Sequence, residues 1–349
     1  MTRDELMAAI RGGDALMELD LSGMDLRGAD LSGGLFQDVR LDGAQLAGAS
    51  LKEAIFSGCS FQGVDFREAK LTQCLMERAE LSRAVFDGAD LTQARWISGK
   101  AAGVSLRKTQ LGLAVFSEID LTGADLSGAQ LDRTAFLDTH MDEVNLSGAF
   151  FKQAVLLKAD LRTAKLTGAR FELSVLVESD LSGKDLRGMQ LTLCQFTDAN
   201  LSKCDLREAV LVQCNFKSAN LEGARLDGAN ATNALFIQAR AAGASFRKAQ
   251  LFQALLPEAD LTRADLSGAS LQQAILTRAQ CSEARFAAAD LTYADFSYAD
   301  ASAADFTGAK LHRTKFHQTL EKGTVGRSKS GALGNDEKLA QAEAWRPRY

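Results

Sequence analysis

Apolar residues return along this chain at every fifth position, from Leu21 to Phe316, without an insertion or a deletion. Of these 60 central positions, 35 are Leu and 17 are Phe. A small residue, mostly Ala, lies two positions before each central residue, and a mostly polar residue separates the two. The segments Ala29-Asp30-Leu31-Ser32-Gly33 and Ala264-Asp265-Leu266-Ser267-Gly268 show the five-residue unit plainly.

A period of five fits neither a helix, with 3.6 residues per turn, nor a flat strand, which alternates every two residues. Within one unit, the small and the central residue are two apart, so an extended segment would point both to the same side. The remaining residues must turn the chain, and Gly tolerates the positive φ that turns require. The pattern therefore predicts an all-β solenoid.

The repeat resembles the pentapeptide-repeat family over residues 19–318, with 60 units in phase. The resemblance implies a right-handed quadrilateral β-helix with four units per coil, about 15 coils here, and inward-pointing central and small residues. Positions 20 apart should then stack in rows. One row, from Phe36 to Phe316 in steps of 20, holds nine of the 17 central Phe, so the sequence itself carries a period of 20.

Both ends of such a solenoid need a cover, because its edge strands are otherwise unpaired. Thr2 and Glu5 form a capping-box pattern and Gly12-Gly13 can stop a helix, so we expect a short helix over residues 3–11. The predicted organisation is an N-terminal cap (1–18), a solenoid (19–318) and a flexible tail (319–349) with a short helix over 336–345. Trp345 either folds back onto the Phe316 end or docks elsewhere.

Composition excludes several classes of protein. No apolar run approaches the roughly 20 residues that span a bilayer, and the N-terminus lacks the layout of a signal peptide, so we expect a cytoplasmic protein. The net charge is only −5, with 40 basic and 45 acidic residues, which argues against direct nucleic-acid binding. Some outward positions carry a band of apolar residues, but no basic residues accompany this band, which argues against membrane binding.

The residue before each central position should be polar, yet along the Phe-rich row it is often large and apolar. Several residues that follow the central position on this side are apolar too, and Gln195 and Asn215 interrupt the band. Exposed apolar patches commonly mark binding surfaces, although β-branched residues also suit extended segments. We predict an interface for a protein partner or for a homodimer, formed by Leu35, Ile55, Leu75, Val115, Leu137, Val155, Leu157, Val175, Val177, Leu235, Ile237, Leu255 and Ile275.

Two further features stand out from the repeat. Asp65–Leu131 and Asp205–Leu271 align without gaps at an offset of seven coils and are identical at just over half of their positions; common ancestry and bivalent binding both explain this. Four consecutive units carry Ser174, Ser179, Lys184 and Met189 where Ala is usual. Because a buried unpaired ammonium is costly, we expect a local distortion that lets Lys184 reach solvent.

Candidate chemistry is scarce. All six Cys fall on inward positions and are expected to be reduced, buried residues, and none has metal-ligand spacing. His140, His312 and His317 fall on outward positions with no catalytic partner in reach by register. We therefore expect no enzyme, no cofactor, no metal site and no small-molecule substrate.

The leading functional prediction is a non-catalytic scaffold that engages a protein through the apolar band. The resemblance also implies two more specific roles. One is an association with bacterial type VI secretion. The alternative is a DNA mimic that binds DNA gyrase or topoisomerase IV, for which a solenoid ~70 Å long with a net charge of −5 is a poor copy of a duplex.

Overall fold

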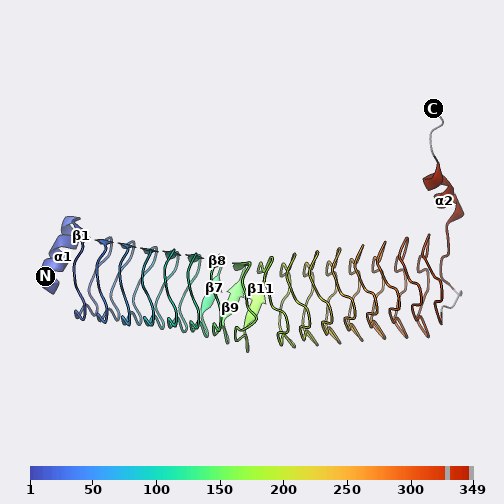
Figure 1. Ribbon diagram of the computed structural model, residues 1–349, viewed down its shortest axis with the longest axis horizontal. Helices are drawn as coiled ribbons and strands as arrows, with labels where there is room; N and C mark the ends of the chain where they lie inside the picture. The colour runs from blue at the N-terminus through green and yellow to red at the C-terminus, as the bar shows by residue number, and fades with distance from the viewer. Residues whose placement is uncertain (327–330, 346–349) are drawn as a thin grey trace. The chain divides into compact units, whose positions relative to one another are not determined.

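The computed structural model describes residues 1–326 and 331–345 (Figure 1). The chain divides into two compact units, Met1–Asp180 and Leu181–Tyr349. Each unit is a parallel β-solenoid, in which the chain winds in coils and each coil bonds to the next. Every bridge between coils up to residue 325 joins residues 20 apart, as in Leu16↔Phe36 and Leu235↔Leu255. The predicted coil of four five-residue units is therefore confirmed.

Unit 1 contains three-residue strands on two sides of its coils. An eight-stranded parallel sheet has the order β1-β2-β3-β4-β5-β6-β8-β10, and a three-stranded sheet has the order β11-β9-β7. Their bounds are β1 Ala15–Met17, β2 Leu35–Gln37, β3 Ile55–Ser57, β4 Leu75–Glu77, β5 Arg95–Ile97, β6 Val115–Ser117, β7 Gln130–Asp132, β8 Ala135–Leu137, β9 Phe150–Lys152, β10 Val155–Leu157 and β11 Arg170–Glu172.

In the described residues of unit 2, the coils are joined by single-residue bridges instead of three-residue strands, with the same register of 20. The turn residues of the five-residue units in both units of the chain have a positive φ, except at Thr163, and they include Gly33 (67°) as well as non-glycine residues such as Gln253 (55°). The five-residue unit is therefore one extended residue pair followed by one left-handed turn.

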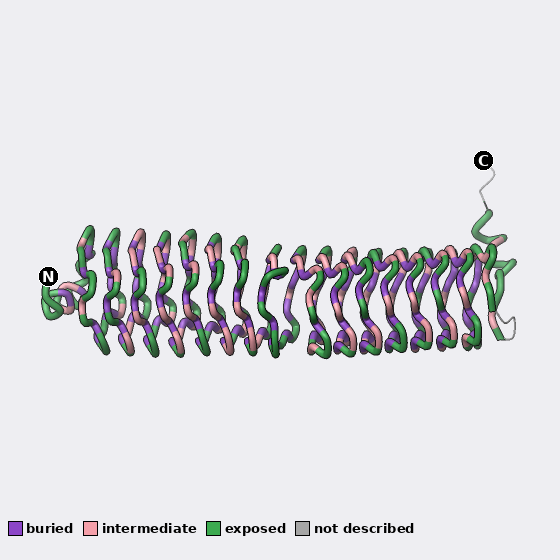
Figure 2. Tube along the Cα trace, turned by 60° about the horizontal axis from the view of Figure 1, so that its bottom comes forward, coloured by how far each residue is buried: buried purple, intermediate pink, exposed green. Residues whose placement is uncertain are grey.

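The core consists of the predicted inward residues. Central Leu and Phe side chains and the small residues before them are almost entirely buried, and Figure 2 shows buried and exposed positions alternating along each coil. Phe rings stack from coil to coil, with centroids 4.6 Å apart for Phe36–Phe56 and 5.2 Å apart for Phe196–Phe216. The Phe-rich row predicted from the sequence is thus a stack of buried rings.

Helix α1 (Arg3–Gly12) covers the first coil of unit 1. The capping box forms between Thr2 and Glu5, and Gly13 ends the helix in the left-handed conformation with φ 78°. Leu6 and Ile10 are the buried residues of the helix, and Arg3 donates a hydrogen bond to the carbonyl of Arg27 at 3.1 Å. The predicted capping helix is confirmed and ends one residue later than expected.

The ladder of bridges extends further than the predicted solenoid limits. At the start, β1 pairs with β2, so residues 15–17 already belong to a coil. At the end, Leu320, Val325 and Leu333 pair with Asp300, Asp305 and Lys315. Helix α2 (Glu337–Ala344) follows in the region where a short helix was expected, with Asp336 as its N-cap.

The run of unusual small-site residues spans the boundary between the two units. Ser174 and Ser179, at the end of unit 1, are fully buried, and the Ser179 hydroxyl donates to the carbonyl of Leu156 at 2.8 Å. Lys184 and Met189, at the start of unit 2, are half-buried, unlike the Ala that usually occupies this site. Lys184 is therefore kept out of the fully buried core, as its charge requires.

Candidate protein-binding face

The outer surface of the eight-stranded sheet in unit 1 carries the apolar side chains predicted from the sequence. In each strand the middle residue points into the core and the two flanking residues point outward, as in the exposed-buried-exposed pattern of β2. We call this surface the apolar face. Its predicted members are Leu35, Ile55, Leu75, Val115, Leu137, Val155 and Leu157 on the sheet, with Val175 and Val177 on the next coil, where Val175 is bridged to Val155. Each of them is exposed or half-buried.

The first part of the apolar face contains its most exposed members. Leu35 is 41% exposed and Ile55 is 40% exposed, and the two are bridge partners on adjacent strands. Polar contacts then interrupt the surface, because the Ser57 hydroxyl donates to Glu77 at 3.2 Å and Arg95 takes the outward position of β5. The break divides the face into two apolar patches.

The second patch has two adjacent rows of aliphatic side chains. Val155 pairs with Ala135 and with Val175, and Leu157 pairs with Leu137, so each row continues from coil to coil. The backbone groups of these strands are used in the ladder. Only side chains are therefore available to a partner, and they offer apolar contact without hydrogen bonds.

Unit 2 has a smaller surface of the same kind. Leu235, Leu255 and Ile275 are joined by successive bridges, and Ile237 lies in the neighbouring outward row. Ile275 is 38% exposed, and the other three are half-buried. The patch begins after Asn215, whose amide donates to Gln195 at 3.0 Å, which confirms the polar interruption expected there.

Sequence reasoning did not single out several other exposed apolar residues. Met17 (49% exposed) precedes the first repeat that the five-residue pattern detects. Leu113 and Leu173 occupy turn positions with positive φ, and Phe252 follows a central residue on another side of unit 2. The signal that finds them is a large apolar residue at an outward position on any side, not only on the Phe-rich side.

Helix α2 contacts unit 2 through Glu343. The Tyr298 hydroxyl donates to one carboxylate oxygen of Glu343, and His317 Nε2 lies 3.2 Å from the other. The Asp336 backbone N–H donates to His317 Nδ1 at 3.1 Å. His317 follows a central residue at an outward position of the repeat, yet it is only 4% exposed, and its partners Asp336 and Glu343 lie beyond the five-residue register.

Trp345 is the C-cap of α2 and is 72% exposed. The contact between the helix and the coils is made by Glu343 and Asp336, not by this indole. Its role as a docking residue for a partner remains a prediction.

The described side chains offer little reactive chemistry. Within residues 1–326 and 331–345, no group of three or more His, Cys, Asp or Glu is arranged to hold a metal ion. All six Cys are free and buried. Burial raises the pKa of Cys59 to about 11 and that of Cys74 to about 12, so neither thiol is a ready nucleophile near neutral pH.

Neither described helix, of ten and eight residues, is long and apolar enough to cross a bilayer.

No curated protein sequence matches the chain. Among solved structures, it is similar to HetL, a pentapeptide repeat protein involved in heterocyst differentiation regulation in the cyanobacterium Nostoc sp. strain PCC 7120 (23% identity, 76% of this chain, 96% of that chain, TM-score 0.32). It is also similar to full-length QnrB1, a plasmid-mediated fluoroquinolone resistance protein (24% identity, 61% of this chain, 93% of that chain, TM-score 0.28).

The family model of pentapeptide repeats matches most of the solenoid. The matched ranges are 20–58, 35–73, 59–95, 102–136, 136–176, 158–192, 174–207, 194–230, 219–257, 244–279 and 279–318. Together with the coil of four five-residue units, these matches show that the chain belongs to the pentapeptide repeat family.

Proposed function

We propose that this protein is a non-catalytic scaffold that binds a protein through the apolar face of unit 1. The observation that carries the proposal is the pair of aliphatic rows formed by Val115, Val155 and Val175 beside Leu137, Leu157 and Val177. Aliphatic side chains are well suited to the core of a protein interface, where apolar area is removed from water.

Two substitutions that place charge in the patch test this proposal. Val155→Asp with Val175→Asp should abolish binding, because an unpaired carboxylate in an apolar contact is costly to desolvate. Val210→Asp is the matched control, since Val210 is also a half-buried residue at a bridge position but lies on another side of the coils, in unit 2. The occupant is a second copy or a foreign protein, as expected from the sequence.

Light scattering of the full chain separates these occupants. If the second copy is the occupant, the wild type and Val210→Asp are dimers and the double variant is a monomer. If the wild type is a monomer, a photo-cross-linker at position 155 should label a partner protein. This labelling should be lost with Val175→Asp and retained with Val210→Asp. Labelling that is unchanged by both substitutions contradicts the proposal.

Removing residues 334–349, which follow the last bridge residue Leu333, tests whether the tail, with Trp345, takes part in the same binding. The association with type VI secretion and the DNA-mimic alternative both remain predictions. A DNA supercoiling assay with purified gyrase and titrated protein tests the latter directly, and inhibition at low stoichiometry would favour it over the scaffold.

A further inference from the structure

One side of the coils has been retained almost unchanged between the two units. The stretches 65–128 and 205–268 correspond at an offset of seven coils, and each contributes 12 outward residues to this side. Eleven of these 12 are identical, and the exception is Val85 against Arg225. We call the 12 outward residues of each stretch its duplicated face.

The other three sides of the same coils have diverged. Of their 27 outward positions within the same two stretches, only nine are identical. Common ancestry by itself would leave the four sides equally similar. The duplicated face has therefore been kept for a reason that does not apply to the other sides.

The requirements of the solenoid do not supply that reason. Other coils carry different residues on this side, including Gln45 with Ala47, Lys165 with Thr167, and Arg285 with Ala287. Their bridges form in the same register, as in Gln45↔Asp65, Asn145↔Lys165 and Arg285↔Asp305. The retained residues are thus not needed to build a coil.

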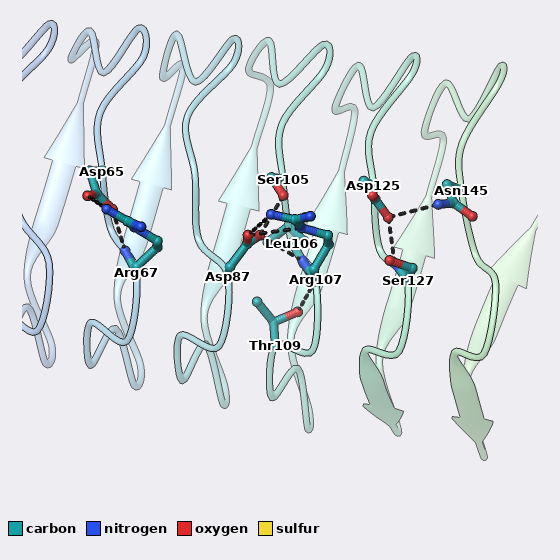
Figure 3. A network of polar contacts seen from close by, with 10 residues as sticks. All are labelled: Asp65, Arg67, Asp87, Ser105, Leu106, Arg107, Thr109, Asp125, Ser127 and Asn145. Carbon is teal, nitrogen blue, oxygen red and sulfur yellow. Dashed lines mark hydrogen bonds and ion pairs between the residues drawn. The ribbon is translucent and has the colours of Figure 1, made fainter.

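The retained side chains are held by polar contacts that recur in both units, and Figure 3 shows those of unit 1. In unit 1, Asp87 accepts hydrogen bonds from the Ser105 hydroxyl and from Arg107 Nε at 2.9 Å. Burial tends to raise the pKa of Asp87, but the hydrogen bonds from Arg107 and Ser105 outweigh it and lower the pKa. In unit 2, Asp227 accepts the corresponding bond from Ser245.

The turn row of this side shows what distinguishes the duplicated face. Its 15 turn residues, from Gly28 to Gly308 in steps of 20, all have positive φ, and ten of them are Gly. The charged residues in the row are Glu68 (φ 58°), Lys108 (φ 55°), Glu208 (φ 59°) and Lys248 (φ 57°). A non-glycine residue is disfavoured in this conformation, so these charges occupy positions where Gly would be easier.

Each of the four side chains is exposed, and each extends past a glycine of the next coil. A Cβ built at Gly128 would lie 3.4 Å from Cγ of Lys108, and one at Gly268 would lie 3.5 Å from Cγ of Lys248. Within the described ranges, none of the four forms an ion pair with another residue of the chain. They are therefore available to a partner.

The charges have the same order in both units. Glu68 precedes Lys108 by two coils, about 10 Å along the solenoid, and Glu208 precedes Lys248 by the same number. A face with a negative and a positive end is complementary to itself after a two-fold rotation, which is the requirement for an isologous contact.

We propose that the duplicated face binds a second copy of this chain. Glu68 or Glu208 of one copy lies opposite Lys108 or Lys248 of the other. The contact is distinct from the proposed binding through the apolar face, because it uses another side of the coils and polar groups.

Such a contact is weak and depends on salt. Exposed ion pairs contribute about 0.2–1 kcal/mol each and are screened at high ionic strength. A patch of four coils, about 19 Å long, is also smaller than the interface of a stable complex. Each chain carries two such patches, and two contacts formed at once bind more tightly than one, which partly offsets the small size of each patch.

Sedimentation velocity of the full chain at low and high salt tests the proposal. The wild type should self-associate at about 25 mM NaCl, and at about 500 mM the association should weaken. The variants Glu68→Lys/Glu208→Lys and Lys108→Glu/Lys248→Glu each place like charges opposite one another, so each should weaken self-association about tenfold or more. Both keep a charged residue at each positive-φ position, and circular dichroism checks that both fold.

The mixture of the two variants gives the decisive result. One variant then carries only positive charges and the other only negative charges at these positions, so an equimolar mixture should associate more strongly than either variant alone. A wild type that stays monomeric at low salt overturns the proposal. Self-association that resists both pairs of substitutions overturns it as well, because the contact then uses another surface. Association through the apolar face behaves differently, since salt does not weaken it.

Discussion

Replacing Phe116 by Ala should destabilise unit 1 strongly. Phe116 is 1% exposed, and its ring lies between Trp96 (centroids 5.2 Å apart, 74° between planes) and Phe136 (5.0 Å, 7°). Burial of a Phe side chain contributes about 1.5–3 kcal/mol, and each ring pair adds about 0.5–1.5 kcal/mol. We expect Phe116→Ala to lower the free energy of unfolding by about 3–5 kcal/mol.

Urea unfolding followed by circular dichroism measures this change as a lower midpoint with an unchanged slope. Phe216→Ala is the matched variant in unit 2, because Phe216 stacks between Phe196 and Phe236 with centroids 5.2 and 4.9 Å away. Phe252→Ala is the control, because Phe252 is 38% exposed. This substitution should lower the free energy of unfolding by less than about 1 kcal/mol. If Phe116→Ala costs no more than Phe252→Ala, the Phe row is not the core and the reasoning fails.

The buried thiols, the aspartates and the tail helix each carry a further prediction. At pH 8, iodoacetamide should leave the six Cys unmodified in the folded protein and alkylate them in urea, because burial raises the pKa of thiols such as Cys59; rapid native labelling would contradict this. Hydrogen bonds from Arg187 lower the pKa of Asp185 to about 2, whereas the pKa in the unfolded chain is about 3.9. Ionised Asp185 therefore stabilises the fold above about pH 4, and this contribution is lost as the pH falls towards about 2. The urea midpoint should fall over this range, and a rise would refute the assignment. Glu343→Ala removes the acceptor of Tyr298, so hydrogen exchange in α2 should quicken while the core stays protected; an unchanged rate would mean that other contacts hold the helix.

Much of the fold could be predicted because the repeat constrains each residue locally. The five-residue period identifies central positions such as Leu31 and Leu266, and the unequal distribution of Phe reveals that four units make one coil. The capping helix was predictable for the same reason, since Thr2, Glu5 and Gly13 act within one turn of the helix ends.

The remaining features depend on contacts between residues far apart in the sequence. His317 lies at an outward position of the repeat, and only the folded position of α2, which starts at Glu337, buries it. Residues 15–17 join the ladder before the repeat pattern becomes regular, because β1 needs only backbone groups and the buried Leu16 to pair with β2. The apolar face could be listed from the sequence, but the hydrogen bond from Ser57 to Glu77 that contributes to its polar break required the folded positions of the side chains.

The apolar face depends on residues 20 apart lying side by side on the outer surface of the coils. Oxidation of the pair Val155→Cys/Val175→Cys tests it most directly, because these residues are bridge partners and coil spacing of about 4.8 Å lies within the Cα range of disulfides. We predict rapid formation of an intramolecular disulfide in this pair, and none in Val155→Cys/Arg170→Cys, whose residues are 15 apart. A disulfide in the second pair but not in the first would contradict the four-unit coil and the apolar face built on it.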